Sequence, residues 1–194
     1  MTAVIILAAG ASTRLGFPKQ TLLYRGKTLI EIAIEAGLKA NFGPVVVVLG
    51  ANAEAIEPGI KHFNITIIQN DSWAAGMASS ISAAITSIEK NEAIDSAVIM
   101  LCDQPFVSRS LIGSMILKQQ QTGSKIVACT YKDTVGVPVL FHRSLFAELL
   151  LLQGQEGAKK ILQAHASEVV AIPFEKGGID IDTLADYEEL IKNS

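Results

Sequence analysis

Short apolar runs that alternate with helix-like stretches constrain the fold of this chain more than any other feature. Each run is rich in branched residues and too short for a helix, as expected of a strand buried on both faces. The predicted strands are residues 3–6, 45–49, 65–68, 97–101, 125–130, 139–141 and 169–172. Apolar residues at helical spacing predict helices at residues 28–40, 52–61, 77–89, 108–121, 144–152, 158–165 and 184–192.

This alternation is typical of βα units wound around a parallel sheet. We therefore expect an α/β fold, a Rossmann-like three-layer sandwich with a mostly parallel sheet. The chain has 194 residues, 49 % of them hydrophobic, which is enough for one full core. No linker, repeat or low-complexity tract interrupts it, so the sequence predicts a single domain over residues 1–194.

Charge and cysteine content argue against several classes of function. The net charge is −3 and the basic residues are scattered, so nothing indicates a nucleic-acid partner. No apolar run approaches the length of a membrane span, and the apolar start is too short for a signal peptide. Cys102 and Cys129 lie in apolar runs without metal-ligand spacing, which favours free buried thiols. We expect a cytoplasmic protein with no membrane partner and no zinc site.

A loop of small and cationic residues follows the first predicted strand. Residues 7–19 read LAAGASTRLGFPK, so Gly10 and Gly16 accompany Arg14 and Lys19. Small residues let the backbone approach a ligand and turn its N–H groups toward it, and two cations suit a polyanion. The spacing differs from both the P-loop and the dinucleotide motif G-x-G-x-x-G. We interpret the loop as a site for a nucleoside triphosphate, with an ordinary glycine-rich turn as the alternative.

Aspartates near the ends of predicted strands are candidates for holding a divalent cation. Asp103 follows the strand 97–101, at the sheet edge where open α/β sheets bind ligands. Mg²⁺ prefers one or two carboxylates together with phosphate oxygens and water. Asp180 and Asp182 lie two residues apart in a strand-like segment, which would place them on one face. For Asp103 the alternative is an N-cap or turn role. For Asp182 the alternatives are a helix-capping role, or Asp180 as the second metal ligand in its place.

Residues 73–81, WAAGMASSI, place small residues and hydroxyls where a helix is predicted to begin. Such a helix start favours open N–H groups suited to a nucleobase or a phosphate. A cap with a tight helix contact is the alternative, and Trp73 is interpreted as a packing residue rather than a stacking one.

Four motifs in order resemble the MobA-like nucleotidyltransferases, the family related to the molybdenum cofactor enzymes. They are L-A-A-G-x-S-x-R-x-G-x-x-K at 7–19, C-D-Q-P at 102–105, G-V-P-V-L-F at 136–141 and D-I-D-T at 180–183. The A-A-G form is similar to the cytidylyltransferase branch. The resemblance runs almost end to end and implies a fold of the nucleotide-diphospho-sugar transferase type. It also implies Mg²⁺-dependent transfer of CMP from CTP to the terminal phosphate of molybdopterin or molybdenum cofactor, with release of pyrophosphate.

The same resemblance implies roles for individual residues. Lys19, Arg14 and Asp103 would serve catalysis, and Asp103 and Asp182 would hold Mg²⁺. Gly76 and Ser80 would hold the cytosine, within a nucleotide-binding set of Leu7, Ala8, Ala9, Gly10, Arg14, Lys19, Gly76 and Ser80. Residues 1–105 would bind the nucleotide and residues 106–194 the acceptor. The implied substrates are CTP and a phosphorylated pterin cofactor, with a molybdoenzyme or its maturation factor as a transient partner.

Three positions depart from the family pattern on its acceptor side. Val137 stands where a polar or basic residue is common, Gln155 where aspartate is common and Lys159 where arginine is common. Two other functions therefore stay open, a cytidylyltransferase acting on a sugar or polyol phosphate and a non-catalytic nucleotide- or cofactor-binding delivery protein. A nicotinamide-dependent oxidoreductase has the least support, because its glycine motif is missing.

Overall fold

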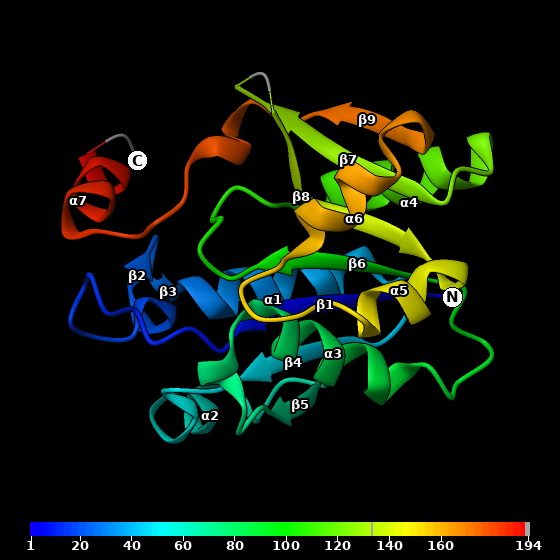
Figure 1. The fold of residues 1–194 in the computed structure, drawn as a ribbon. Coiled ribbons are helices and arrows are strands. Elements are labelled where there is room, and N and C mark those ends of the chain that lie inside the picture. The colour runs from blue at the N-terminus through cyan, green and yellow to red at the C-terminus, as the bar shows by residue number, and fades with distance from the viewer. Residues whose placement is uncertain (133, 193–194) are drawn as a thin grey trace.

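The protein is built around one seven-stranded sheet, shown in Figure 1. The computed structural model describes residues 1–132 and 134–192. The sheet has the strand order β5-β4-β1-β6-β8-β7-β9. Strand β8 is antiparallel to both neighbours, and the other neighbouring pairs are parallel. The strands are β1 (Thr2–Ala8), β4 (Val45–Leu49), β5 (Thr66–Gln69), β6 (Ser96–Leu101), β7 (Ile126–Tyr131), β8 (Thr134–His142) and β9 (Val169–Pro173).

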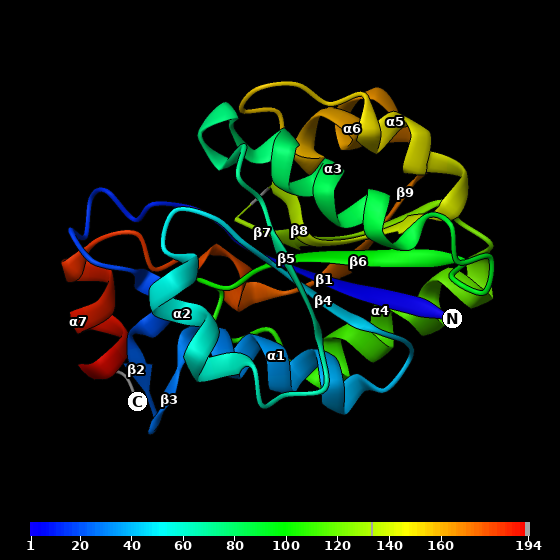
Figure 2. The ribbon, with the colours of Figure 1, turned by 90° about the horizontal axis from the view of Figure 1, so that it is seen from below.

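Helices cover both faces of this sheet, as Figure 2 shows. One face carries α1 (Leu29–Ala40), α2 (Ala53–Ile60) and α4 (Arg109–Thr122). The other carries α3 (Met77–Ile88), α5 (Phe146–Leu150) and α6 (Ala158–Ala164). The expected three-layer α/β sandwich with a mostly parallel sheet is confirmed. No helix among the described residues is both long and apolar enough to cross a membrane.

The central strand β1 explains why the apolar runs are continuous rather than alternating. Ile5 points into the core under α3, α5 and α6, whereas Ile6 points into the core under α1, α2 and α4. Both side chains are fully buried. Because both faces of β1 are covered, every residue of the strand is selected for apolarity, and period-2 alternation disappears.

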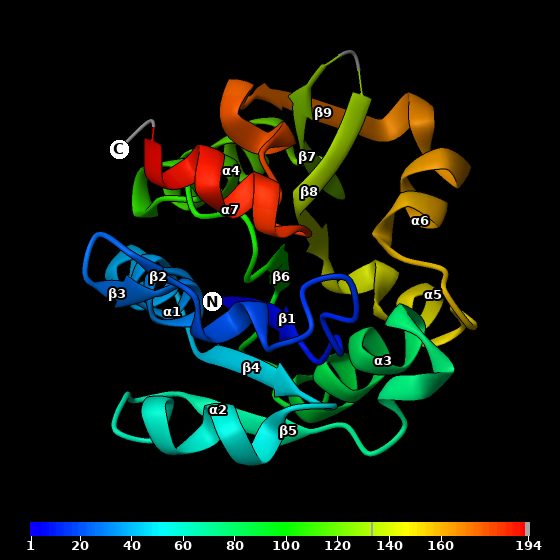
Figure 3. The same cartoon turned by 90° about the vertical axis from the view of Figure 1, so that its left-hand side faces the viewer.

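A third, smaller apolar cluster lies outside the sandwich. Helix α7 (Leu184–Lys192) packs beside the two-stranded hairpin of β2 (Leu23–Tyr24) and β3 (Lys27–Thr28), as Figure 3 shows. The buried residues of this cluster include Tyr24 and Leu190. This cluster holds the end of the chain next to the loop that follows β1, and so positions residues just before α7.

Some expectations about individual elements were wrong. Residues 179–182 form no strand, because the chain leaves the sheet after β9 and crosses to α7 in an irregular path. The hairpin β2–β3 was not predicted, since strands of two residues are too short to show a period. Strand β8 begins at Thr134 rather than 139, because Gly136 and Pro138 disguise its first half. The 144–152 helix is a 3₁₀ turn at Arg143–Leu145 followed by α5.

His165, just after α6, links three elements through carboxylates. Its Nε2 lies 2.8 Å from Glu148 Oε2 on α5, and its Nδ1 lies 3.2 Å from Glu168 Oε1. These hydrogen bonds, that of Glu148 first, raise the pKa of His165 above its ordinary value. The folded chain therefore holds the proton more tightly than the unfolded chain. The resulting stabilisation is complete below the ordinary pKa and is lost as the pH rises through the raised one.

We expect a shift from pH 8 to pH 6 to stabilise the wild-type protein more than a His165→Gln variant. The difference should be a few tenths to about 1 kcal/mol, since the ion pairs are partly exposed. Urea unfolding at both pH values measures it, with the exposed His62→Gln as control. An identical pH dependence of wild type and His165→Gln would contradict the assignment.

Candidate active site

A cavity of about 460 Å³ opens at the carboxyl ends of the central strands. Strands β1 and β6 are parallel neighbours, with Leu7 opposite Leu101, so the loop after β1 and Asp103 after β6 meet at one edge. All the residues proposed from the sequence for nucleotide, metal and catalysis line this cavity. They are Leu7, Ala8, Ala9, Gly10, Arg14, Lys19, Gly76, Ser80, Asp103 and Asp182.

The loop after β1 is held in place by Gln20, whose importance the sequence did not reveal. Gln20 is almost fully buried, and its Nε2 donates to the carbonyl oxygens of Ala8 at 2.8 Å and Gly10 at 3.1 Å. The Ser12 hydroxyl adds a second tie by accepting the Lys19 backbone N–H at 3.1 Å. A glutamine that follows a lysine forms no recognisable sequence motif. Only the folded structure shows that Gln20, at the end of the loop, bonds to Ala8 and Gly10 at its start.

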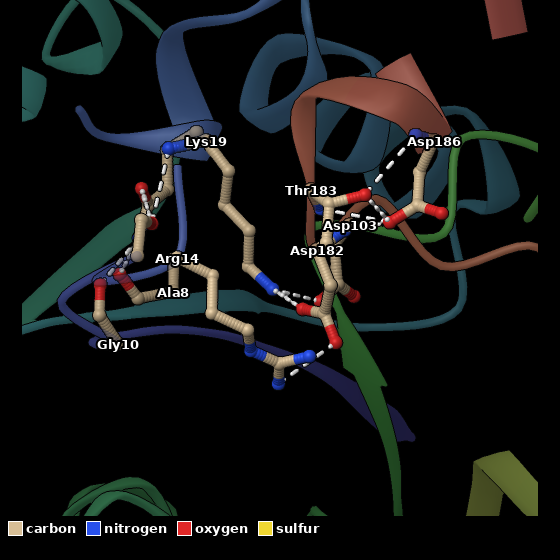
Figure 4. A network of polar contacts seen from close by, with 10 residues as sticks. Ala8, Gly10, Arg14, Lys19, Asp103, Asp182, Thr183 and Asp186 are labelled. Carbon is tan, nitrogen blue, oxygen red and sulfur yellow. Dashed lines mark hydrogen bonds and ion pairs between the residues drawn. The ribbon is translucent and has the colours of Figure 1, made fainter. Parts of the chain in front are cut away.

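Lys19 joins two carboxylates that are distant in sequence, as Figure 4 shows. Its Nζ donates to Asp103 Oδ2 and, at 2.8 Å, to Asp182 Oδ1. Asp182 also pairs with Arg14, whose Nη2 lies 3.2 Å from Oδ2. The Lys19 and Asp103 side chains are 16 % and 9 % exposed, whereas Arg14 is 70 % exposed. The Lys19–Asp103 pair is thus largely removed from water, whereas the Arg14–Asp182 contact is a weak surface pair.

Lys19 keeps its positive charge in this setting. Burial alone would lower its pKa, but the charge of Asp103 and the hydrogen bonds to Asp103 and Asp182 outweigh burial and raise the pKa above its ordinary value. The lysine is therefore a permanent cation at the floor of the cavity, suited to a negatively charged ligand rather than to proton transfer.

Asp182 is held in position by the start of α7. The Asp186 carboxylate accepts the backbone N–H groups of Asp182 at 3.1 Å and Thr183 at 2.7 Å. The Thr183 hydroxyl in turn accepts the Asp186 N–H at 3.2 Å. This reciprocal arrangement caps the helix. Thr183 is therefore the capping residue, and the alternative of a capping role for Asp182 was wrong.

The two carboxylates fit a divalent cation completed by a substrate. One nitrogen, Lys19 Nζ, reaches both, so Asp103 and Asp182 converge closely enough to share a cation. Asp103 Oδ1 is buried and finds no hydrogen-bond partner among the described residues. Within residues 1–132 and 134–192, no three His, Cys, Asp or Glu side chains gather as a closed metal site. An ion such as Mg²⁺, which takes one or two carboxylates plus phosphate oxygens, suits this donor set.

The other end of the cavity is formed by the start of α3. Ser80 is buried, and its hydroxyl accepts a hydrogen bond from Asn70 Nδ2 at 3.0 Å. The Ala78 N–H donates to the carbonyl of Gly154 at 3.1 Å. Contrary to expectation, this N–H is therefore not open for a ligand. Trp73 is 38 % exposed and lines the cavity, so part of its ring faces this space.

Asp180 does not share the cavity with Asp182. Because residues 179–182 are not a strand, the two side chains are not on one face. Asp180 instead lines a separate cavity of about 240 Å³ with Phe106 and Lys132. Desolvation, followed by the charge of Asp103, raises the pKa of Asp180 to about 6, although much of the residue is exposed.

The free cysteines lie in the interior and supply no nucleophile. Cys102 and Cys129 are both buried. Burial, with the charge of Asp103 as a second cause for Cys102, raises the pKa of each thiol to about 12. Both therefore stay protonated near neutral pH, and a thiolate is not available even though Cys102 adjoins the cavity.

We expect Gln20→Met to destabilise the protein by about 1–3 kcal/mol, because the carbonyls of the buried Ala8 and of the more exposed Gly10 lose their donor. Urea unfolding measures the change, and Gln120→Met on the exposed side of α4 is the matched control. A Gln20→Met midpoint as close to wild type as that of the control would show that the loop does not depend on Gln20.

Comparisons with known proteins agree with this architecture. A nicotine blue oxidoreductase of Paenarthrobacter nicotinovorans is 31 % identical over 196 residues, covering 96 % of this chain and 95 % of that protein. The crystal structure of Rv0371c from Mycobacterium tuberculosis in complex with manganese superposes with a TM-score of 0.83 at 28 % identity. It covers 100 % of this chain and 99 % of its own. The molybdenum cofactor cytidylyltransferase of Escherichia coli is 32 % identical over 85 residues, 44 % of each chain.

A family model also matches most of the chain. Residues 4–169 match the MobA-like NTP transferase domain, which spans the sheet from β1 to the start of β9. The glycine loop and Asp103 fall within the match, and Asp182 lies beyond it. The chain therefore belongs to the family of MobA-like NTP transferase domains and is a nucleotidyltransferase.

Proposed function

We propose that this protein is a Mg²⁺-dependent cytidylyltransferase that transfers CMP from CTP to the terminal phosphate of molybdopterin or molybdenum cofactor. The observation that carries the proposal is the convergence of Lys19, Asp103 and Asp182 on one side of a cavity bordered by a glycine-containing loop. A permanent cation beside two carboxylates can bind a triphosphate and the ion that accompanies it. The two unpaired, buried thiols are in keeping with action in the cytoplasm.

The proposed reaction needs positioning and charge neutralisation rather than a protein nucleophile. A terminal phosphate oxygen of the acceptor attacks the α-phosphorus of CTP, forming a new P–O bond. The bond from the α-phosphorus to the oxygen bridging to the β-phosphate breaks, and pyrophosphate leaves with the electron pair. Such transfers depend on alignment and on electrostatic stabilisation of the moving charge. Lys19 would neutralise charge near the α-phosphate, and the more exposed Arg14 would meet the outer phosphates.

Asp103 and Asp182 would hold Mg²⁺, and the bound ion would supply charge neutralisation and alignment of the phosphate oxygens. Since Lys19 contacts both carboxylates, it would exchange some of these contacts for phosphate when the nucleotide enters. The manganese in the Mycobacterium tuberculosis structure supports the use of a divalent cation in this fold. Asp103 has an unused buried oxygen to offer, which makes it the more important of the two carboxylates.

The choice of CTP and of the acceptor rests on similarity as well as on shape. The loop of Ala8, Ala9 and Gly10 has the form of the cytidylyl branch, and a molybdenum cofactor cytidylyltransferase is among the relatives. Of the three positions that depart from the family pattern, Gln155 lines the cavity, whereas Val137 and Lys159 do not. A molybdoenzyme or its maturation factor would receive the product.

The oxidoreductase among the relatives suggests a different chemistry, and the cavity favours the transferase. This chain lacks the G-x-G-x-x-G turn that brings a dinucleotide pyrophosphate onto a helix start. In its place stand a lysine and two carboxylates, which a dinucleotide does not require. We therefore keep redox activity as an outcome that the experiment below can detect.

We expect pyrophosphate release from CTP, in preference to GTP, when Mg²⁺ and a phosphorylated pterin are supplied. Asp103→Asn should reduce turnover at least about 100-fold, because a neutral amide replaces a hard anionic ligand. The exposed Asp71→Asn is the matched control and should stay near wild type. Pyrophosphate and nucleotidyl product are quantified for CTP, GTP, ATP and UTP.

Other outcomes of this assay would replace the proposal. Release only with a sugar or polyol phosphate would move the protein to a different acceptor class. Preference for GTP would move it to the guanylyl branch. Nucleotide binding without turnover by any acceptor would favour a delivery protein, and oxidation of a reduced nicotinamide cofactor would favour the redox chemistry of the other relative.

We expect Lys19→Ala to lower turnover by about two to three orders of magnitude, as for loss of one electrostatic contact to developing charge. Lys19→Arg should recover only part, because the guanidinium keeps the charge but changes its reach. The exposed Lys61→Ala is the control, and steady-state kinetics with CTP and acceptor measure the effect. Unchanged turnover with only a raised Michaelis constant would make Lys19 a binding residue.

A further inference from the structure

We propose that Gln155, on the loop between α5 and α6, hydrogen-bonds the base of the bound nucleotide and contributes to the choice of nucleotide. The inference rests on the proposed function in one respect, that a nucleoside triphosphate occupies the cavity. It assigns to nucleotide recognition a residue that lies in the segment expected to serve the acceptor. Gln155 lines the same cavity as Gly10 and Lys19.

The loop of residues 151–157 forms a wall of the cavity by packing on the start of α3. The carbonyl of Gly154 accepts the N–H of Ala78 at 3.1 Å. At Gly76 the backbone has a φ of +110°, and a Cβ there would lie 2.2 Å from the Gly154 oxygen and 2.9 Å from the Gln155 nitrogen. Only glycine allows this approach. The start of α3 and the 151–157 loop are thus in backbone contact at Gly154 and Gln155.

The loop also has internal contacts that fix its shape. The Gln153 N–H donates to Glu156 Oε2 at 2.9 Å, and the Glu156 N–H donates to the Gln153 carbonyl at 3.0 Å. A Cβ at Gly157 would lie 2.8 Å from Met77 Sδ, which places the far end of the loop against α3 as well. These contacts fix the backbone of the turn that carries Gln155, and the backbone sets where the side chain begins.

The position of Gln155 in the cavity indicates which part of a nucleotide it would meet. Lys19, Asp103 and Asp182 form the charged end, suited to phosphates. Gln155 lies beside the start of α3, since a Cβ at Gly76 would be 2.9 Å from its backbone nitrogen, and Figure 3 shows the α5–α6 loop next to α3. With the triphosphate at the charged end, the base extends toward α3.

The chemistry of this end suits a base. The Gln155 carboxamide is exposed to the cavity and has no hydrogen-bond partner among the described residues. A carboxamide both donates and accepts, as the edge of a nucleobase does. Trp73 and Met77, 38 % and 40 % exposed, offer apolar surface for the flat faces of the ring. A triphosphate could accept the carboxamide N–H, but it would use neither the carboxamide oxygen nor the apolar surface, and a base would use all three.

The test is equilibrium binding, measured by calorimetry with Mg²⁺, of CTP, GTP, ATP, UTP and inorganic tripolyphosphate. We expect Gln155→Ala to weaken the tightest of the four nucleotides about three- to tenfold, the range of one hydrogen bond. The substitution should also reduce the differences in affinity among the four nucleotides. Tripolyphosphate, which has no base, should bind wild type and Gln155→Ala equally. Gln153→Ala, from the same loop but outside the cavity, should match wild type for every ligand.

Three results would overturn the inference. These are equal nucleotide affinity of wild type and Gln155→Ala, an equal loss for tripolyphosphate, and an equal loss in Gln153→Ala. The two proposals fail separately. Nucleotide binding that depends on Gln155 but gives no pyrophosphate release would overturn the transferase and leave the base contact standing. Failure of the wild-type protein to bind any of the four nucleotides would overturn both.

Discussion

The contact of Lys19 with Asp103 and Asp182 is the interaction on which the site depends. It joins three segments, the loop after β1, the end of β6 and the approach to α7. Two of these are brought together by the sheet, because β1 and β6 are neighbours. The third arrives only through the packing of α7 against the β2–β3 hairpin. A buried charge pair is tolerated when its partners are fixed, and here each partner is fixed by a different element.

The two ends of the cavity are held by different kinds of contact. At the charged end, Gln20 ties the loop carbonyls and Thr183 with Asp186 fixes the approach to α7. At the other end, the wall is a loop held by a few backbone contacts and by glycines. Strict geometry is needed where charge moves during phosphoryl transfer, whereas base contacts tolerate more adjustment. The side-chain hydrogen bonds are accordingly concentrated at the charged end, and backbone contacts hold the other end.

Much of the fold could be predicted because the strands are buried on both faces. Uninterrupted apolar runs such as 45–49 and 97–101 have few other interpretations in a chain of this size. Strand order could not be predicted, since periodicity carries no information on neighbours. The segment 179–182 was misassigned because Ile179 and Ile181 alternate with aspartates as a strand would, although tertiary contacts with Lys19 and with Asp103 decide its path.

The site was predicted as far as short motifs reach. Lys19 and Asp103 stand in recognisable local patterns, whereas Gln20 has ordinary neighbours and its ties to the loop carbonyls appear only in the folded chain. Gln155 was noticed only as a departure from the family pattern, and the sequence did not show that it lines the cavity. Sequence reasoning placed the open helix start at residues 77–79, but could not foresee that a loop more than seventy residues later would occupy the Ala78 N–H. Side-chain chemistry can be recognised in a linear pattern, and competition for backbone groups cannot.

The position of Asp182 beyond the family match has a consequence for how such domains are delimited. Residues 4–169 contain the sheet almost entirely, together with the glycine loop and Asp103. A fragment cut at that boundary would lose most of β9 and all of α7. Lys19 would then lose one of its two carboxylates, and the β2–β3 hairpin would lose its neighbour α7. The segment that matches the family is therefore shorter than the segment that forms the charged end of the cavity. A boundary drawn from shared sequence alone would cut Asp182 away from Lys19 and Asp103.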